Sequence, residues 1–363
     1  MIIREIELKD FRNYKNLQVS FSEDINIFLG ENAQGKTNLL EGIYLNAMAK
    51  SFKTIREREM IRFGEDYCRI KTKANYSDDD HLIEIAISRE GAKAITVDGV
   101  KIRRTSELLD KVHIIIFSPE DLKIVKDEPT KRRNFIDREI CQIRPRYVSD
   151  LNQYRRALKQ RNACLKEETV DEGVLDIWDR ELVQYGSRVV RMRREFIQSI
   201  GEISRDIHHR ISGGRENLEL QYETEIDDEG NEENFFYDLL KKEREKDRHY
   251  GSTGKGPHRD DLKISADGRD LRRFGSQGQQ RTAALSLKLS EIKVIEDETG
   301  EKPILLLDDV LSELDNERQK YLINSLGDNQ MFITTTDLIG SVARSLPQGK
   351  VFRIKNGEID IEI

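Results

Sequence analysis

The pattern Gly-x-x-x-x-Gly-Lys-Thr, at residues 30–37, constrains the fold of this chain more than any other feature. It is typical of a P-loop, in which the backbone N–H groups of a glycine-rich turn surround phosphate oxygens at the start of a helix. An apolar segment, Ile25–Leu29, precedes the pattern, and Asn38–Tyr44 after it has helical character. Because a P-loop lies between a strand and a helix, the sequence predicts a nucleotide-binding α/β unit.

All eight motif residues are predicted to contact the nucleotide: Gly30, Glu31, Asn32, Ala33, Gln34, Gly35, Lys36 and Thr37. The ammonium group of Lys36 is expected to reach the β- and γ-phosphates of ATP, where it takes part in catalysis. The hydroxyl group of Thr37 is expected to ligate Mg²⁺. A chance occurrence of the pattern is the alternative, and the flanking strand and helix argue against it.

An aliphatic segment that ends in two acids lies near the other end of the chain, at Pro303–Asp309. A buried strand that delivers a carboxylate at its carboxyl end is the Walker B arrangement. Asp308 is expected to hold Mg²⁺ through water, alongside Thr37. Asp309 is placed to orient or deprotonate the attacking water. The alternative is a buried strand whose end happens to be acidic.

Lys36 and Asp308 are 272 positions apart, although both must reach one nucleotide. The two ends of the chain are therefore expected to fold together, with the middle as a separate lobe. We predict an ATPase lobe from residues 1–125 and 251–363 and a helical lobe from residues 126–250. Apolar residues at alternating steps of three and four, from Leu182 to Ile203, predict a helix there that packs against a neighbour.

The net charge is −7, so a nucleic-acid partner requires a local basic surface. Residues 129–215 supply one, with 19 Lys and Arg against 13 Asp and Glu, whereas residues 216–247 have 4 against 13. Three clusters are candidate phosphate contacts: Lys131–Arg133, Arg155–Arg156 and Arg191–Arg194. For each cluster, a solvated helix face with ion pairs is the alternative.

The cysteines Cys68, Cys141 and Cys164 are far apart and form no C-x-x-C motif. This usage favours a reducing compartment and argues against a disulfide framework or a zinc site. No apolar run approaches 18 residues, and the first residues alternate in charge, unlike a signal peptide. The sequence predicts a cytoplasmic protein that does not associate with a membrane.

These motifs resemble those of the ATP-binding-cassette (ABC) heads of SMC-type DNA repair ATPases, and most closely the RecF family of bacterial recombination mediators. The resemblance covers essentially the whole chain. It implies an α/β fold, a P-loop ABC-type ATPase head built from both chain ends, with an inserted α-helical lobe and no long coiled coil. The segments that carry it, in the family's order, are Phe11–Tyr14, Gly30–Thr37, Phe117–Leu122, Gly256–Leu262, Ser276–Arg281 and Leu305–Asp315.

The resemblance also implies residue roles at a dimer interface. In cassette ATPases a signature loop, L-S-G-G-Q, caps the γ-phosphate that is bound to the opposite subunit. Ser276, Gly278 and Gln279 match its serine, second glycine and glutamine, while Gly275 and Gln277 replace its leucine and first glycine. ATP is therefore expected to join two chains into a homodimer. Further implied contacts are the D-loop match Ser312–Asp315 at the dimer seam, and Arg12 and Asn32 at the nucleotide.

The function implied by the resemblance is an ATP-dependent DNA-binding clamp in DNA repair, replication, recombination and the SOS response to DNA damage. The implied target is gapped DNA at boundaries of single-stranded and duplex DNA, bound without sequence preference. The implied partners are RecR and RecO, which act with the clamp in loading recombinase. Hydrolysis through Asp308 and Asp309 is expected to dissociate the dimer and release the DNA.

Three departures from the general cassette pattern accompany the resemblance. Asp309 stands where the pattern has glutamate, and Thr334–Thr336 stand where it has a switch histidine. Both suggest slow hydrolysis, and hence a switch rather than a motor. The resemblance implies a weak ATPase that depends on DNA. Phe117–Leu122 offers Glu120 in place of the Q-loop glutamine. Two alternatives remain, a transporter's cassette subunit and a non-hydrolysing ATP sensor. At His258–Asp261 a structural turn is favoured over a metal cluster.

Overall fold

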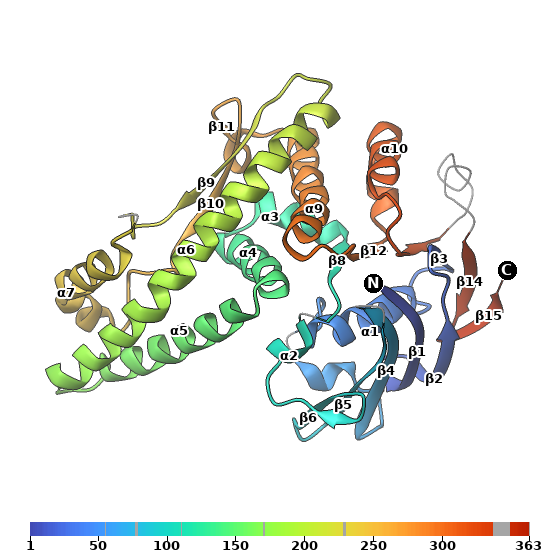
Figure 1. Cartoon of the computed structure of the whole chain (residues 1–363), viewed down its shortest axis with the longest axis horizontal. Coiled ribbons are helices and arrows are strands. Elements are labelled where there is room, and N and C mark those ends of the chain that lie inside the picture. Colours follow the sequence, from blue (N-terminus) through green and yellow to red (C-terminus); the bar gives the residue numbers. More distant parts are fainter. Residues whose placement is uncertain are drawn as a thin grey trace. The chain divides into compact units, whose positions relative to one another are not determined.

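The computed structural model describes residues 1–54, 56–76, 79–109, 111–169, 171–227, 230–336 and 349–362 (Figure 1). The chain forms two compact units. Unit 1 consists of Met1–Asp121 and Lys288–Ile363, and unit 2 consists of Leu122–Leu287. The first unit boundary lies close to the predicted one at residues 125 and 126. Residues 251–287, predicted with the ATPase lobe, lie instead in unit 2, because the strand at Asp261–Ala266 pairs with the strand at Leu218–Glu223.

A six-stranded sheet in unit 1 has the order β15-β14-β3-β13-β12-β8, and it is parallel except for the pairing of β14 with β15. Every residue of β8 and β12 is buried, as is typical of parallel strands covered on both faces. The strands are β3 (Ile25–Leu29), β8 (Ile114–Phe117), β12 (Ile304–Asp308), β13 (Met331–Thr335), β14 (Lys350–Lys355) and β15 (Glu358–Glu362).

A second, antiparallel sheet in unit 1 has the order β2-β1-β4-β5-β6-β7. Gln330 links the two sheets, because its side chain accepts a hydrogen bond from the N–H of Ile3 (2.7 Å) and donates to the carbonyl groups of Ile3 (2.8 Å) and Ser22 (2.7 Å). The strands are β1 (Ile2–Phe11), β2 (Tyr14–Ser20), β4 (Tyr67–Tyr76), β5 (Asp79–Ser88), β6 (Lys93–Val97) and β7 (Val100–Lys101).

Helix α1 (Lys36–Met48) contacts strands of both sheets, and 11 of its 13 residues are buried. Because α1 is buried on nearly all sides, the close-packed core around it fixes its amino end next to the P-loop. The shorter helical segments of unit 1 are η1 (Glu57–Met60), α2 (Ser106–Leu109), η2 (Pro119–Asp121), η3 (Val310–Glu313) and α10 (Asn316–Ser325).

Unit 2 is built around the 40-residue helix α6, and α5 and α7 lie along it (Figure 1). A three-stranded sheet, β11-β10-β9, completes the unit. The elements are α3 (Leu122–Lys126), α4 (Pro129–Ile143), α5 (Pro145–Cys164), α6 (Glu172–Ile211), β9 (Leu218–Glu223), α7 (Glu232–Tyr250), β10 (Asp261–Ala266), β11 (Arg269–Asp270) and α8 (Leu271–Phe274). Helix α9 (Gln277–Thr299) begins in unit 2 and ends in unit 1.

The apolar seam predicted in the helical region lies on α6, where Leu182, Val189 and Phe196 are buried. Close packing of three helices requires a glycine at position 186. A β-carbon at Gly186 would lie 2.7 Å from the ring of Phe236 on α7 and 3.1 Å from the ring of Tyr154 on α5. The predicted helix and its packing against neighbours are therefore confirmed.

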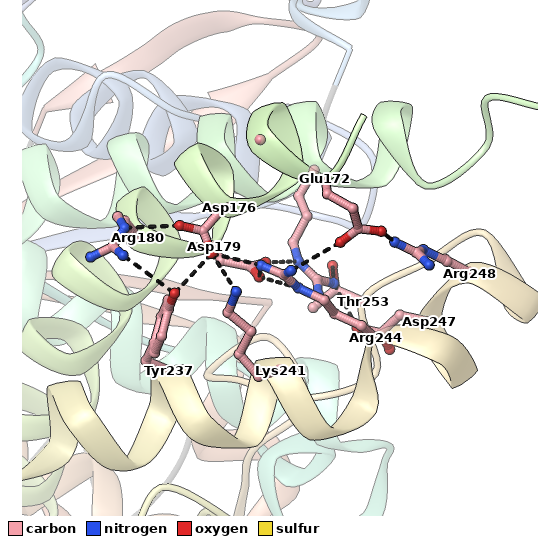
Figure 2. Close-up of polar contacts among 12 residues, drawn as sticks. Glu172, Asp176, Asp179, Arg180, Tyr237, Lys241, Arg244, Asp247, Arg248 and Thr253 are labelled. Atoms are coloured by element: carbon pink, nitrogen blue, oxygen red, sulfur yellow. Dashed lines mark hydrogen bonds and ion pairs between the residues drawn. The ribbon is translucent and has the colours of Figure 1, made fainter. Parts of the chain in front are cut away.

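Ion pairs join the helices of unit 2 as well (Figure 2). Asp179 of α6 accepts hydrogen bonds from Arg244 of α7 and, at 2.6 Å, from the fully buried guanidinium of Arg161 on α5. Arg161 also donates to Asp247 (2.6 Å) and Thr253 (2.8 Å). A buried charge is tolerated only when it is paired in this way, and pairing fixes the relative positions of its partners. Arg161 is thus a structural residue.

Among the described residues, no helix has the length and apolar content that crossing a membrane requires. All three cysteines have free thiol groups, and Cys68 is buried.

Candidate nucleotide site and signature segment

The P-loop connects β3 to the first turn of α1. Gly35 has φ = +121°, a backbone conformation that favours glycine, and a β-carbon there would lie 2.6 Å from Nδ2 of Asn13. No side chain caps the amino end of α1, so the N–H groups of its first turn are available to an anion. The helix dipole adds positive potential at the same point. This geometry fits a phosphate group.

Residues from distant segments brace the loop. Nδ2 of Asn13 donates to the carbonyl of Gln34 (3.0 Å), and the hydroxyl of Tyr14 donates to the carbonyl of Gly35 (3.0 Å). The turn between β14 and β15 contributes as well, because the N–H of Asn356 donates to Oε1 of Gln34 (2.7 Å). Burial raises the pKa of Tyr14 well above its usual range, so its hydroxyl remains a donor. Sequence reasoning used Phe11–Tyr14 as a family motif and missed this bracing role.

Lys36 is 3% exposed, and its ammonium group lies over the loop. It donates hydrogen bonds to the carbonyl groups of Gly30 (2.6 Å) and Glu31 (3.0 Å). Burial along the loop leaves the lysine stem few alternative positions. The positive charge is therefore held where the P-loop motif requires it for binding phosphate.

The acidic strand end meets the P-loop in unit 1, as predicted. The hydroxyl of Thr37 donates to Oδ1 of Asp308 (2.8 Å), across 271 positions of sequence. Strand β13 lies between β3 and β12, and its residue Thr334 donates to the same oxygen (3.0 Å). Burial raises the pKa of Asp308, the two hydroxyl groups oppose that shift, and the neighbouring charge of Asp309 adds to it. A cation next to Asp308 would therefore stabilise its charged form.

Asp309 is half-buried and has φ = +50°. Its N–H donates to Oγ1 of Thr334 (2.9 Å), and its carbonyl accepts from the hydroxyl of Ser312 (2.7 Å). Thr334 therefore orders both acids. The sequence identified Thr334–Thr336 only as a departure from the cassette pattern. Its position at the carboxyl end of a strand beside the acidic strand was the signal for this role.

The oxygen atoms of Thr37 and Asp308 suit Mg²⁺, which takes one or two protein ligands and completes its shell with phosphate oxygens and water. Within the described ranges, no group of three or more His, Cys, Asp and Glu side chains has the geometry of a metal site. The two-residue set therefore fits an ion that a nucleotide brings with it.

Arg12 is engaged by protein groups. Its guanidinium forms a two-pronged ion pair with the buried carboxylate of Glu41 on α1 (2.8 and 2.6 Å) and donates to the carbonyl of Glu59 (2.7 Å). Its predicted contact with nucleotide stays a prediction. The exposed residue Asn32 lies in the P-loop, as the motif requires.

The signature segment belongs to unit 2, at the start of α9. Ser276 and Gln279 form a reciprocal cap, because the N–H of Gln279 donates to Oγ of Ser276 (3.3 Å) and the N–H of Ser276 donates to Oε1 of Gln279 (2.9 Å). Gly278 lies between them in the first turn. A β-carbon at Gly275 would lie 2.5 Å from the carbonyl of Leu271, so glycine suits this position better than the leucine of the general motif.

The D-loop match precedes α10 in unit 1. Asp315 caps that helix by accepting from the N–H of Arg318 (3.0 Å). The Q-loop match forms a turn after β8, in which the N–H of Ser118 donates to Asp121 (2.7 Å) and Glu120 is exposed.

Residues 256–260 form a structural turn that leads into β10 at Asp261, and the turn favoured from sequence at His258–Asp261 lies there. His258 donates through Nε2 to the carbonyl of Thr253 (3.0 Å) and accepts through Nδ1 from the hydroxyl of Tyr154 (2.6 Å). Asp260 accepts from the hydroxyl of Tyr222 (2.5 Å). These contacts tie the segment to α5 and β9. Burial and nearby arginines lower the pKa of His258 to about 4.

We expect acid to destabilise the fold through His258. The unfolded histidine takes up a proton below about pH 6.5, whereas the folded one does so only near pH 4, so stability is complete above pH 6.5 and falls between these values. The free energy of unfolding falls by at most about 3 kcal/mol over this range. Chemical denaturation of the native chain and of His258→Gln from pH 7 to pH 4 measures it. Burial raises the pKa of Asp260, so this carboxyl group stabilises the fold as the pH falls and partly offsets the effect of His258. The measurement therefore compares the change in unfolding free energy with pH between the native chain and His258→Gln. Identical pH profiles would contradict the prediction, and exposed His209→Gln is the control.

Two of the predicted basic clusters are largely structural. Arg132 is 2% exposed and forms a two-pronged ion pair with Asp261 (2.6 and 2.8 Å). Arg193, also 2% exposed, donates to Asp137 (2.7 Å). In the third cluster, Arg155 pairs with Asp137 (3.1 Å) but remains exposed. Burial therefore removes Arg132 and Arg193 from the candidate phosphate contacts.

The fold and the paired motifs define an ABC-type ATPase head of the SMC class. The family model described as RecF/RecN/SMC N terminal domain matches residues 2–345. The chain belongs to the RecF family. It is 47% identical to the DNA replication and repair protein RecF of Agathobacter rectalis, over 99% of each chain, and 42% identical to that of Bacillus mycoides, over 100% of this chain and 99% of the relative.

A solved structure of the recombination mediator protein RecF-ATP in the RecFOR pathway is similar throughout. Its TM-score is 0.92 at 39% identity, with 100% of this chain and 97% of that chain covered. An Smc head domain of Pyrococcus furiosus shares the fold, with a TM-score of 0.58 at 17% identity, over 100% of this chain and 96% of that chain. The family membership confirms the predicted resemblance, and the family's role is in DNA replication and repair.

Proposed function

We propose that this protein is an ATP-dependent DNA-binding clamp of cytoplasmic DNA repair and replication. The observation that carries the proposal is the hydrogen bond of Thr37 to Asp308, which assembles the P-loop and the acidic strand end into one site. Relatives described as DNA replication and repair proteins, and a solved structure described as RecF-ATP, support ATP and DNA as the ligands.

In this proposal Lys36 and the first turn of α1 bind the phosphates, and Thr37 and Asp308 hold Mg²⁺. The ion neutralises charge that develops on the phosphate oxygens. Asp309 accepts a proton from the attacking water. The aspartate is one methylene shorter than the usual glutamate, so we propose slow hydrolysis that acts as a switch.

We further propose that Ser276, Gly278 and Gln279 bind the γ-phosphate held by a second copy of the chain. Their place at the amino end of α9 supports this role, because a helix start attracts anions. ATP would then hold a homodimer together, and hydrolysis would separate it. Gapped DNA as the target, RecR and RecO as partners and action in the SOS response belong to the same proposal.

The exposed face of α5 is the proposed contact with DNA. A shallow depression on it is lined by Arg155, Leu158, Lys159, Asn162, Ala163 and Lys166. Within the described residues, Lys159, Lys166 and the exposed Arg156 have no ion-pair partner. Arg156 and Lys159 lie on α5 about 5 Å apart along the helix axis, which is between one and two nucleotide steps of one strand, and Lys166 lies two residues after the last residue of the helix, Cys164. The spacing suits a phosphate backbone and reads no bases.

Replacing Arg156, Lys159 and Lys166 together with alanine is expected to weaken DNA binding at least about tenfold near 0.1 M salt. Three lost contacts would reduce the slope of log K against log salt by about 2.7, whatever the base sequence. Fluorescence anisotropy with a labelled gapped duplex at several salt concentrations measures both. Lys242→Ala with Lys246→Ala, exposed on α7, is the matched control. An unchanged salt slope would remove α5 from the contact.

The decisive experiment for the function is measurement of molecular mass in solution with and without ATP and a gapped duplex. We expect a monomer without ATP, a dimer with ATP and a ternary complex with both. A protein that stays monomeric with ATP and DNA present would overturn the clamp. Turnover assays with and without DNA separate the switch from a non-hydrolysing sensor.

A further inference from the structure

The carboxylate of Glu216 bridges two elements of unit 2. Its Oε1 accepts a hydrogen bond from Nε2 of Gln279, in the signature segment (3.0 Å). Its Oε2 lies 3.2 Å from Nε2 of His208, a fully buried residue in the last turn of α6. The N–H of Glu216 also donates to Oγ of Ser212 (3.3 Å), the cap residue that follows α6. One side chain therefore connects the end of the longest helix to the start of α9.

A second contact joins the same two helices. Nδ1 of His208 lies 3.3 Å from the hydroxyl of Ser286, which is buried on α9 and donates to the carbonyl of Thr282 (2.8 Å). The last turn of α6 is thus bound to α9 directly at Ser286 and through Glu216 at Gln279. A displacement of the end of α6 is expected to reach the signature segment, because close-packed interiors transmit strain.

The chemistry of Glu216 also sets the orientation of the Gln279 amide. A carboxylate only accepts hydrogen bonds, so it selects the NH₂ group of the amide. The amide oxygen then faces the N–H of Ser276, as observed at 2.9 Å. A residue with both donor and acceptor groups at position 216 would accept either orientation and lose this selection.

We propose that Glu216 is a positioning residue, which fixes the signature segment through Gln279 and couples it to α6. The chain His208–Glu216–Gln279–Ser276 passes a displacement of α6 on to the serine that binds the γ-phosphate. The proposal rests on the proposed function of the signature segment, and DNA bound along the helices of unit 2 supplies the displacement. Monomeric ATP binding through Lys36 does not depend on Glu216.

The test is a double-mutant cycle on the full chain, with Glu216→Ala, Gln279→Ala and the pair. We expect each single variant to reduce the DNA stimulation of ATP hydrolysis about tenfold. The double variant is expected to lose no more stimulation than either single variant. Glu216→Gln keeps the size of the side chain and is expected to lose stimulation as well. ATP affinity of the monomeric Glu216 variants is expected to match that of the native chain. Exposed Glu219→Ala on β9 is the control.

The proposal is overturned if the double variant loses stimulation by the product of the two single losses, those of Glu216→Ala and Gln279→Ala. Native stimulation in Glu216→Gln would overturn it as well. In both cases the native chain still dimerises with ATP and responds to DNA, so the proposed function stands. A native chain that neither dimerises nor responds to DNA overturns both.

Discussion

Lys36→Ala is expected to weaken ATP binding about 100-fold and to abolish ATP-dependent dimerisation. The ammonium group lies over the P-loop, 2.6 Å from the carbonyl of Gly30, where phosphate oxygens would replace the loop carbonyls as its partners. Two charge-assisted hydrogen bonds to phosphate contribute about 3 kcal/mol in total, and each 1.4 kcal/mol is a factor of ten in affinity. Titration calorimetry with ATP and Mg²⁺ measures the loss.

Lys50→Ala is the matched control, because Lys50 is an exposed lysine two residues after α1. Lys36→Arg is a stricter test, since the bulkier planar guanidinium does not fit the position that the ammonium occupies. It is expected to prevent dimerisation and DNA binding as well. If Lys36→Arg dimerises with ATP and binds DNA like the native chain, the mechanism is wrong.

Asp309→Asn is expected to slow ATP hydrolysis by a factor of about 10² to 10⁴ while ATP affinity stays native. An amide has the size of the carboxylate but does not accept the proton of the attacking water. The backbone is preserved, because asparagine tolerates the left-handed conformation at φ = +50° and keeps the N–H bond to Thr334. The dimer formed with ATP is therefore expected to persist. Phosphate release and solution mass measure the two effects.

Asp328→Asn is the control for this variant, since the side chain of Asp328 is 96% exposed. Native turnover in Asp309→Asn would remove the proposed role of Asp309. Loss of ATP binding in the same variant would show that the carboxylate acts in binding and not in the chemical step.

The sequence identified the nucleotide site because its chemistry is local. The glycines and Lys36 of the P-loop must be adjacent in the chain, and four aliphatic residues before Asp308 mark a buried strand. The helical middle was recognised from its periodicity in the same way. The lobe boundary at residue 251 differed from the unit boundary, because the pairing of β9 with β10 is a contact between distant segments that no local pattern records.

The predicted basic clusters also show that a local sequence pattern does not record contacts between distant segments. Clusters of arginine predict a phosphate surface equally well whether the side chains face solvent or a buried carboxylate. Arg132 and Arg193 face Asp261 and Asp137, which lie far from them in sequence. Only Arg155–Arg156, of the predicted clusters, lies on the face that we assign to DNA.

The sequence by itself determined the P-loop, the acidic strand end and the order of the family's segments, because backbone geometry and metal ligation require particular residues at short spacings. The tertiary structure alone decided that Thr334 orders both acids, that Glu216 holds the signature glutamine and that α5 presents unpaired cations. These features depend on burial and on hydrogen bonds between side chains from distant segments, and folding is what brings such side chains together.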